Sequence, residues 1–181
     1  MRRIVVIALS VMLPLVMVSG IAWAVTMTCS GDCWGTKEPD TIYGSAKKNM
    51  INSDLGEDYI AGKAAGDNLY GNRQDDEIHG NGGDDKIRGG KHHDTDKLYG
   101  EAGNDILVGV EEFSPSTADY LDCGDGNDDT AYVDPYAEGS PDITVNCENV
   151  IPAQCEDVYP SHLCPTPASR EALSASVRKG R

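Results

Sequence analysis

A nine-residue unit repeats from residue 40 to residue 128, and this period constrains the fold more than any other feature of the chain. Each unit contains an acidic or amide residue followed two positions later by an aliphatic residue. The first members of these pairs are Asp40, Asn49, Asp58, Asp67, Asp76 and Asp85 at strict intervals, then Asp96, Asp105, Asp119 and Asp128 after short insertions. A fixed short period predicts one structural unit stacked many times, which is a solenoid.

The aliphatic positions predict the strands of this solenoid. They are Ile42, Ile51, Ile60, Leu69, Ile78, Ile87, Leu98, Leu107 and Leu121, and the tenth unit slips by one residue to Asp129 and Ala131. Side chains alternate along a strand, so only the aliphatic one points inward while its two neighbours face water. Ten such strands give about five turns, roughly 24 Å of stack at about 4.8 Å per layer.

The segments between the predicted strands have the composition of a cation site. Their glycines permit a tight reversal with positive φ, in which backbone carbonyls point outward beside the aspartate carboxylate. Ca²⁺ prefers six to eight oxygen ligands of this mixed kind, whereas Mg²⁺ demands a tighter octahedron and keeps its waters. We therefore expect several Ca²⁺ ions as cofactors, with Mg²⁺ the poorer ligand.

The repeat resembles the RTX, or hemolysin-type, nonapeptide G-G-x-G-x-D-x-U-x, in which U is a large aliphatic residue. Residues 80–88 and 100–108 are the best copies. The resemblance implies an all-β, right-handed parallel β-roll with two units per turn and ions between each loop and the next but one. One edge would carry Asp40, Asp58, Asp76, Asp96 and Asp119, and the other Asn49, Asp67, Asp85, Asp105 and Asp128.

The expected ligand set combines repeat carboxylates with loop glycines. It comprises Asp58, Asp67, Asp76, Asp85, Asp96, Asp105, Asp119, Asp128, Gly62, Gly80, Gly82, Gly83, Gly100 and Gly103. The loops of Asp67, Asp85, Asp105 and Asp128 have the best glycine content. Residues 44–49 form the poorest loop, and loops 62–67 and 71–76 place Ala65 and Gln74 where the family has glycine. Several loops are therefore expected to be turns without metal.

The ends of the chain indicate export. Residues 1–24 have two arginines, an apolar run and a small-residue cleavage site after Ala24, as a secretory signal peptide does. The alternative is a membrane anchor, but about 15 apolar residues are short for a span of about 20. Without Arg2 and Arg3, 13 of the 15 basic side chains remain against 30 acidic ones, a net charge of −17. Such a chain repels nucleic acid and anionic lipid, and we expect it to fold poorly until cations neutralise it.

The six cysteines all follow the predicted signal and are expected to cap the stack. An even number in an exported chain favours disulfides over zinc thiolates, and neighbour pairing (29–33, 123–147, 155–164) is the simplest of 15 connectivities. The expected organisation is a signal at 1–24, an N-terminal cap at 25–39, the β-roll at 40–132, a C-terminal cap at 133–164 and a disordered basic tail at 165–181. Residues 142–145 are expected to add one strand, tied back by Cys147 to Cys123.

The sequence gives little support for a transition-metal site or for catalysis. His92, His93 and Asp94 could ligate a transition metal, but no ligand from another segment is visible, and an exposed polar loop is favoured. The paired carboxylates are explained by the repeat, and no nucleophile or phosphate-binding motif occurs.

Function therefore rests on the repeats. RTX repeats usually follow a protease, lipase or pore-forming domain. The expected cap at residues 25–39 is only 15 residues long and leaves no room for such a domain. We expect a secreted, extracellular calcium-binding protein that is not an enzyme and folds as Ca²⁺ loads. The alternatives are an adhesion or matrix protein that binds a cell-surface component, and a polysaccharide-modifying enzyme.

Overall fold

The computed structural model describes residues 24–90, 92–111, 117–134 and 142–152. Every regular element in these ranges is a β-strand, and none of the described segments forms a helix that could cross a membrane. The strands are β1 (Thr26–Thr28), β2 (Cys33–Trp34), β3 (Thr41–Tyr43), β4 (Met50–Asn52), β5 (Tyr59–Ala64), β6 (Asn68–Asn72), β7 (Glu77–Gly82), β8 (Lys86–Gly90), β9 (Lys97–Ala102), β10 (Ile106–Val108), β11 (Tyr120–Asp122), β12 (Thr130–Val133), β13 (Ile143–Val145) and β14 (Asn149–Pro152).

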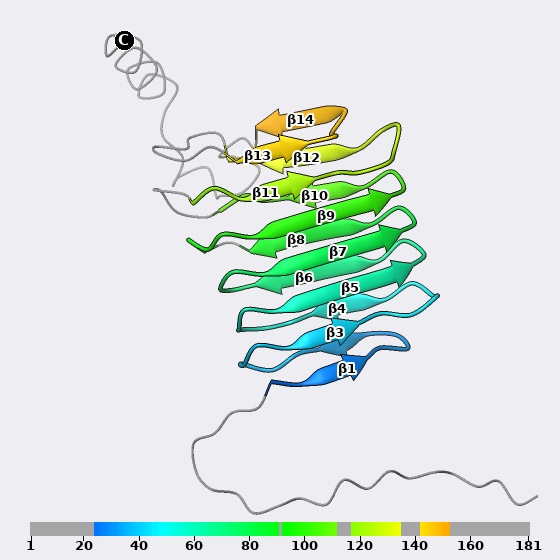
Figure 1. The fold of residues 1–181 in the computed structure, drawn as a ribbon, viewed down its shortest axis with the longest axis vertical. Coiled ribbons are helices and arrows are strands. Elements are labelled where there is room, and N and C mark those ends of the chain that lie inside the picture. The colour runs from blue at the N-terminus through cyan, green and yellow to red at the C-terminus, as the bar shows by residue number, and fades with distance from the viewer. Residues whose placement is uncertain (1–23, 91, 112–116, 135–141, 153–181) are drawn as a thin grey trace, which may run out of the picture.

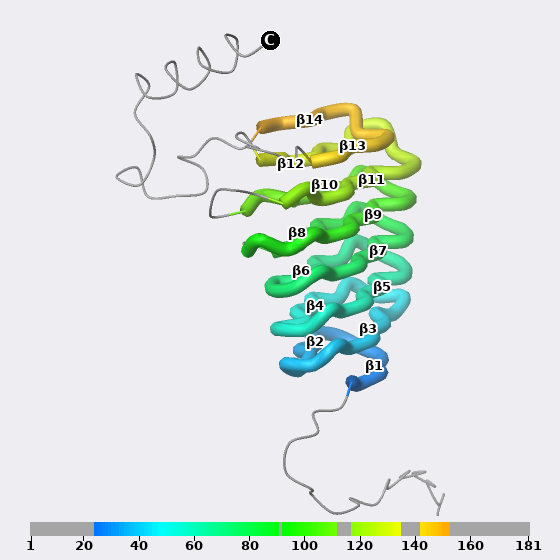
Figure 2. Tube along the Cα trace, turned by 60° about the vertical axis from the view of Figure 1, so that its left-hand side comes forward, coloured from blue at the N-terminus to red at the C-terminus, as the bar shows by residue number. Residues whose placement is uncertain are grey.

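The strands form two parallel sheets that face each other in a β-solenoid (Figure 1). The odd-numbered strands make one sheet in the order β1-β3-β5-β7-β9-β11-β13, and the even-numbered strands make the other. Each strand crosses to the opposite sheet and the chain returns one layer further along, as the tube in Figure 2 shows. Two nine-residue units therefore make one turn, which confirms the all-β parallel β-roll.

The core is a single column of side chains from each sheet. Registers such as Ile42 with Ile60 and Ile51 with Leu69 align the aliphatic positions of successive turns. All ten predicted inward side chains, Ala131 included, are at most 1 % exposed. A three-residue strand buries only one large side chain, so stability comes from stacking of turns.

The stack is longer than the ten strands expected. β3 to β12 are those ten, and β13 is the additional strand expected at residues 142–145. β1, β2 and β14 extend the two sheets further. In the final turn the outer side chains of Ile143 and Ile151 are exposed, and Val150 is also exposed although its register partner Ala131 is buried.

Disulfides close both ends of the described stack. Cys29 pairs with Cys33, and Cys123 pairs with Cys147 across 24 residues, as neighbour pairing predicted. The expected pair of Cys155 with Cys164, the expected signal at residues 1–24 apart from Ala24, and the basic tail lie outside the described residues.

The outer face of the odd-numbered sheet carries a continuous row of rings. Tyr59 contacts Tyr43 and His79, with ring centroids 6.1 and 5.4 Å away. His79 stacks on Tyr99 at 4.6 Å, and Tyr99 contacts Tyr120 at 5.7 Å. The rings therefore pack mainly on one another along the solenoid axis, which adds cross-strand contacts to the sheet.

Candidate metal centre

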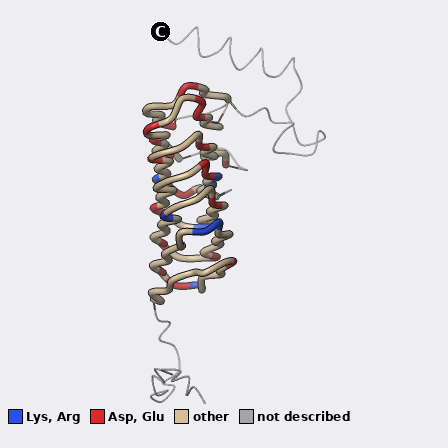
Figure 3. The backbone as a smooth tube through the Cα atoms, turned by 90° about the vertical axis from the view of Figure 1, so that its right-hand side faces the viewer, with Lys and Arg blue, Asp and Glu red and all other residues tan. Residues whose placement is uncertain are grey.

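The repeat carboxylates lie in two rows, one along each edge of the solenoid. Each aspartate stands two positions before an inward aliphatic residue, so strand alternation turns its side chain inward as well. The first edge carries Asp40, Asp58, Asp76, Asp96, Asp119 and Asp142, and the second edge carries Asn49, Asp67, Asp85, Asp105, Asp129 and Glu148. Acidic positions recur along the whole stack in Figure 3.

One carboxylate oxygen of each aspartate or glutamate in the rows accepts a backbone hydrogen bond from the preceding turn, whereas Asn49 accepts one from Ser45 N in its own loop. On the second edge Asp67 N donates to Asp85 Oδ1 at 2.6 Å, and Asp85 N donates to Asp105 Oδ1 at 2.8 Å. The same bond recurs along both edges at distances up to 3.0 Å. Hence each carboxylate fixes the register of two successive turns.

The second oxygen has no such partner in most of these carboxylates. Oδ2 is shielded from solvent and accepts no hydrogen bond in Asp58, Asp67, Asp76, Asp85, Asp105 and Asp129. Buried polar atoms are rarely left unsatisfied, because desolvation without a hydrogen bond costs about 1–3 kcal/mol, and more for a charge. A row of such atoms at equivalent positions indicates a missing partner with positive charge.

Burial also raises the pKa of these carboxyls. Desolvation is the largest cause at each, and it raises the pKa from 3.8 to about 6 for Asp67, about 7 for Asp85 and about 9 for Asp76. Neighbouring carboxylates of the same row add to the increase at Asp76 and Asp85. On Asp96 and Asp119 the pKa is about 7 and about 9 for the same first cause. A cation beside the row would restore the charged form.

Glycines make room for the second oxygen. A Cβ on Gly62 would stand 2.5 Å from Asp67 Oδ2 and 2.9 Å from Gly80 O, one turn further on. Gly80 and Gly100 stand in the same relation to Asp85 and Asp105. Each such glycine therefore brings a carboxylate oxygen and a carbonyl oxygen of the next turn to one place, which suits a hard cation with oxygen ligands. Gly82 has open space around it, apart from Lys63 O at 3.6 Å.

Among the residues that the structure describes, no three His, Cys, Asp or Glu side chains converge on one point. A cation in these loops would therefore take most of its ligands from backbone carbonyls. This donor set is unsuited to zinc, which prefers nitrogen and sulfur, and it fits Ca²⁺.

Four of the loops have positive φ at equivalent positions, whether or not glycine stands there. Gly83 has φ of +112° and Gly103 has +147°, and the equivalent Ala65 and Gln74 have +74° and +73°. The two loops with non-family residues therefore keep the shape of the others, at the cost of left-handed strain.

The first two loops differ from the rest. Asn49 Oδ1 accepts from Ser45 N at 2.8 Å, and Asn49 Nδ2 donates to Gly31 O at 2.8 Å. Asp40 Oδ2 likewise accepts from Thr36 N at 2.6 Å. The hydroxyls of Thr36 and Ser45 complete both turns. In these loops the side-chain oxygens are hydrogen-bonded within the loop itself.

Sequence reasoning missed three members of the rows. Asp129 rather than the expected Asp128 enters the second edge: Asp129 is buried and accepts from Asp105 N at 2.7 Å, whereas Asp128 is exposed. The slip of one residue to Ala131 was the available signal. Asp142 and Glu148 extend the rows, and Glu148 does so with a longer side chain that the aspartate pattern does not detect.

The first insertion was expected to be an exposed polar loop, and for Asp94 this is wrong. Asp94 is 8 % exposed, while His93 in the same insertion is exposed. The burial follows from a contact with another turn that the sequence does not reveal: Asp94 Oδ2 accepts a bond from Gln74 N.

A scan against family models matches residues 34–64, 62–95 and 94–110 to the RTX calcium-binding nonapeptide repeat, in 4 copies. Comparisons with curated proteins and with solved structures found no match. The matched residues run from Trp34 in β2 through β10 and include the row members from Asp40 to Asp105. Residues 34–110 of this chain therefore match the RTX calcium-binding nonapeptide repeat family.

Proposed function

We propose that this chain is an exported calcium-binding protein whose repeat array folds as several Ca²⁺ ions load between stacked loops. The buried, unpartnered Oδ2 atoms along both edges carry this proposal. A chain with 30 acidic residues that buries a row of carboxyls lacks a counter-charge. An ion that binds only the folded state supplies it and stabilises the fold by mass action.

Export rests on two supports. Residues 1–24 have the layout of a secretory signal peptide, with cleavage after Ala24. The four described cysteines form two disulfides, which persist in oxidising compartments outside the cytosol. We therefore place the working protein outside the cell.

Binding rather than catalysis is the proposed role. The carboxylate pairs that might resemble an acid/base dyad belong to the repeat, and their oxygens hold the register of successive turns. An activity screen on polyuronates, run with calcium, is the check: turnover by the purified chain would contradict a purely binding role.

The direct test is circular dichroism of the purified exported chain during a calcium titration. Excess EGTA should shift the spectrum toward coil and leave only part of the chain folded, and added CaCl₂ should convert it to a β spectrum with a matching rise in thermal stability. MgCl₂ at the same concentrations is the control and should convert much less. An unchanged β spectrum in EGTA would contradict folding coupled to binding.

A calcium-stabilised adhesion or matrix protein is the second candidate, and one surface favours it. A cavity of about 290 Å³ on the even-numbered sheet is lined by Tyr70, Arg88 and His92 among others. Arg73 Nε donates to His92 Nε2 at 2.9 Å at its rim. Arg73 and Arg88 outnumber the one lining carboxylate, that of Asp54, and this excess of positive charge suits an anionic surface component. Retention of the chain by cell-wall material with calcium, and its release by EGTA, would support this candidate.

A further inference from the structure

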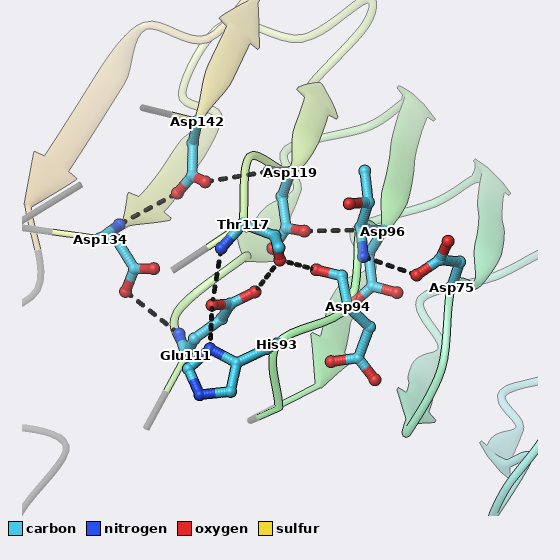
Figure 4. A network of polar contacts seen from close by, with 10 residues as sticks. Asp75, His93, Asp94, Asp96, Glu111, Thr117, Asp119, Asp134 and Asp142 are labelled. Atoms are coloured by element: carbon cyan, nitrogen blue, oxygen red, sulfur yellow. Dashed lines mark hydrogen bonds and ion pairs between the residues drawn. The ribbon is translucent and has the colours of Figure 1, made fainter. Parts of the chain in front are cut away.

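The two longest insertions in the nine-residue period both fall in loops of the first edge. One lies between β8 and β9, and the other lies between β10 and β11. They contact each other through Thr117, whose Oγ1 lies within hydrogen-bonding distance of Asp94 O and of Glu111 Oε1 (Figure 4). Thr117 N also donates to Glu111 Oε2 at 3.0 Å. Thr117, held by Glu111, therefore fixes the backbone of the first insertion at Asp94.

This contact places the Asp94 side chain against the preceding turn. Its Oδ2 accepts a hydrogen bond from Gln74 N, in loop 71–76. Its Oδ1 is shielded from solvent and has no hydrogen-bond partner, although the residue is only 8 % exposed. Asp76, which ends loop 71–76, has an Oδ2 atom in the same condition. Two carboxylates from successive turns of one edge thus each leave a buried oxygen unpartnered.

We infer that Asp94 is an additional calcium ligand outside the nine-residue repeat, acting on an ion held between loop 71–76 and the first insertion. This inference rests on the proposed calcium binding. Asp94 Oδ1 and Asp76 Oδ2 supply two charged oxygens, and backbone carbonyls supply the remainder. The nonapeptide provides one carboxylate per loop, so Asp94 raises the ligand charge of this site, and ligand charge is one of the factors that set Ca²⁺ affinity.

A purely structural role does not account for an aspartate here. The bond to Gln74 N needs only an acceptor, which asparagine would supply without charge. Burial is the main cause of the raised pKa of Asp76, Asp96 and Glu111, and the negative charge of Asp94 raises the pKa of each further. An ion between the two carboxylates offsets this repulsion.

Isothermal titration with CaCl₂ tests the assignment on the disulfide-intact exported chain, comparing wild type with Asp94→Asn. Asp75→Asn is the matched control, because this substitution removes the same charge from the same edge. The asparagine can still accept the hydrogen bond that Thr95 N donates. We expect Asp94→Asn to lose one bound ion or to weaken one site at least about tenfold. The control should retain wild-type stoichiometry.

Thermal unfolding separates a ligand from a structural residue. A ligand role predicts that Asp94→Asn lowers the midpoint only with calcium and leaves it equal or higher in EDTA. An equal loss in both conditions, or unchanged calcium binding by a folded variant, would overturn the inference but leave the proposed function intact. Failure of the wild type to bind calcium would overturn both.

Diffraction on wild-type crystals grown with calcium gives a readout that needs no variant. The inference requires an ion about 2.3–2.6 Å from Asp94 Oδ1, the range of Ca²⁺–oxygen bonds. The inference would be overturned if loop 71–76 were clear in the density and ions were present at other loops but none was bound to Asp94.

Discussion

Asp67 donates its backbone N–H to Oδ1 of Asp85, 18 residues later, at 2.6 Å, while Asp85 Oδ2 is buried with no partner. One side chain thus has two separable tasks. Oδ1 aligns two turns of the solenoid and needs only an acceptor, whereas Oδ2 carries charge that a cation must neutralise. Substitutions can therefore separate the alignment of turns by Oδ1 from the charge carried by Oδ2.

Asp85→Asn should keep the alignment and lose the ion. Asparagine can still accept from Asp67 N through Oδ1, but its amide replaces the charged oxygen. We expect weaker calcium binding and a lower melting temperature with calcium. In EGTA at neutral pH the melting temperature should be equal or higher, because a buried charge has been removed. A large loss of stability in EGTA alone would contradict the division of tasks.

Asn49→Asp should not create a calcium site. Asn49 Nδ2 donates to Gly31 O at 2.8 Å, and a carboxylate there would face a carbonyl oxygen instead. We expect a loss of about 1–3 kcal/mol in the free energy of unfolding. Calcium stoichiometry should stay at the wild-type value. A gained ion with no loss of stability would show that loop 44–49 is metal-competent.

Ala65→Gly should stabilise the calcium-loaded chain. Ala65 holds φ of +74°, and glycine adopts this conformation without the Cβ clash. The relief of strain is about 1 kcal/mol, partly offset by the greater entropy of glycine in the unfolded chain. Chemical denaturation with calcium measures it. The reverse change, Gly83→Ala, serves as the opposite control: it should destabilise, since its Cβ would lie 2.5 Å from Ala65 C.

Calcium-free stability should fall as pH rises. Burial raises the pKa of Asp67 to about 6, of Asp85 to about 7 and of Asp76 to about 9, whereas the unfolded carboxyls remain near 3.8. Between these values the folded chain binds more protons than the unfolded chain, so the free energy of unfolding decreases with pH from about 4 to about 9.

Denaturation in EDTA at a series of pH values measures this dependence. The calcium-free chain should be most stable near pH 4 and least stable above pH 9. With saturating calcium the free energy of unfolding should decrease less steeply with pH, or should increase, because the ion displaces the protons from the carboxyls. Higher stability of the calcium-free chain at pH 8 than at pH 5 would contradict the assignment.

Much of this structure could be predicted from the sequence because the repeat is local and regular. In the three-residue strand segment around Ile78 or Leu107, the central aliphatic side chain is the one that enters the core. The nine-residue period determines which strands lie side by side in successive turns. Contacts that depend on departures from the period could not be predicted. Asp94 is buried by Gln74 and Thr117, which lie 20 and 23 residues away, and Asp129 replaces Asp128 because an extra residue in its loop shifts the register.

The position of bound calcium in a crystal grown with the ion tests the account most directly. We predict ions within about 2.3–2.6 Å of the Oδ2 atoms of Asp67, Asp76, Asp85, Asp105 and Asp129, and none in the self-closed loops 35–40 and 44–49. Ions bound by Asp40 or Asn49, or Oδ2 atoms left without a metal at saturating calcium, would contradict it.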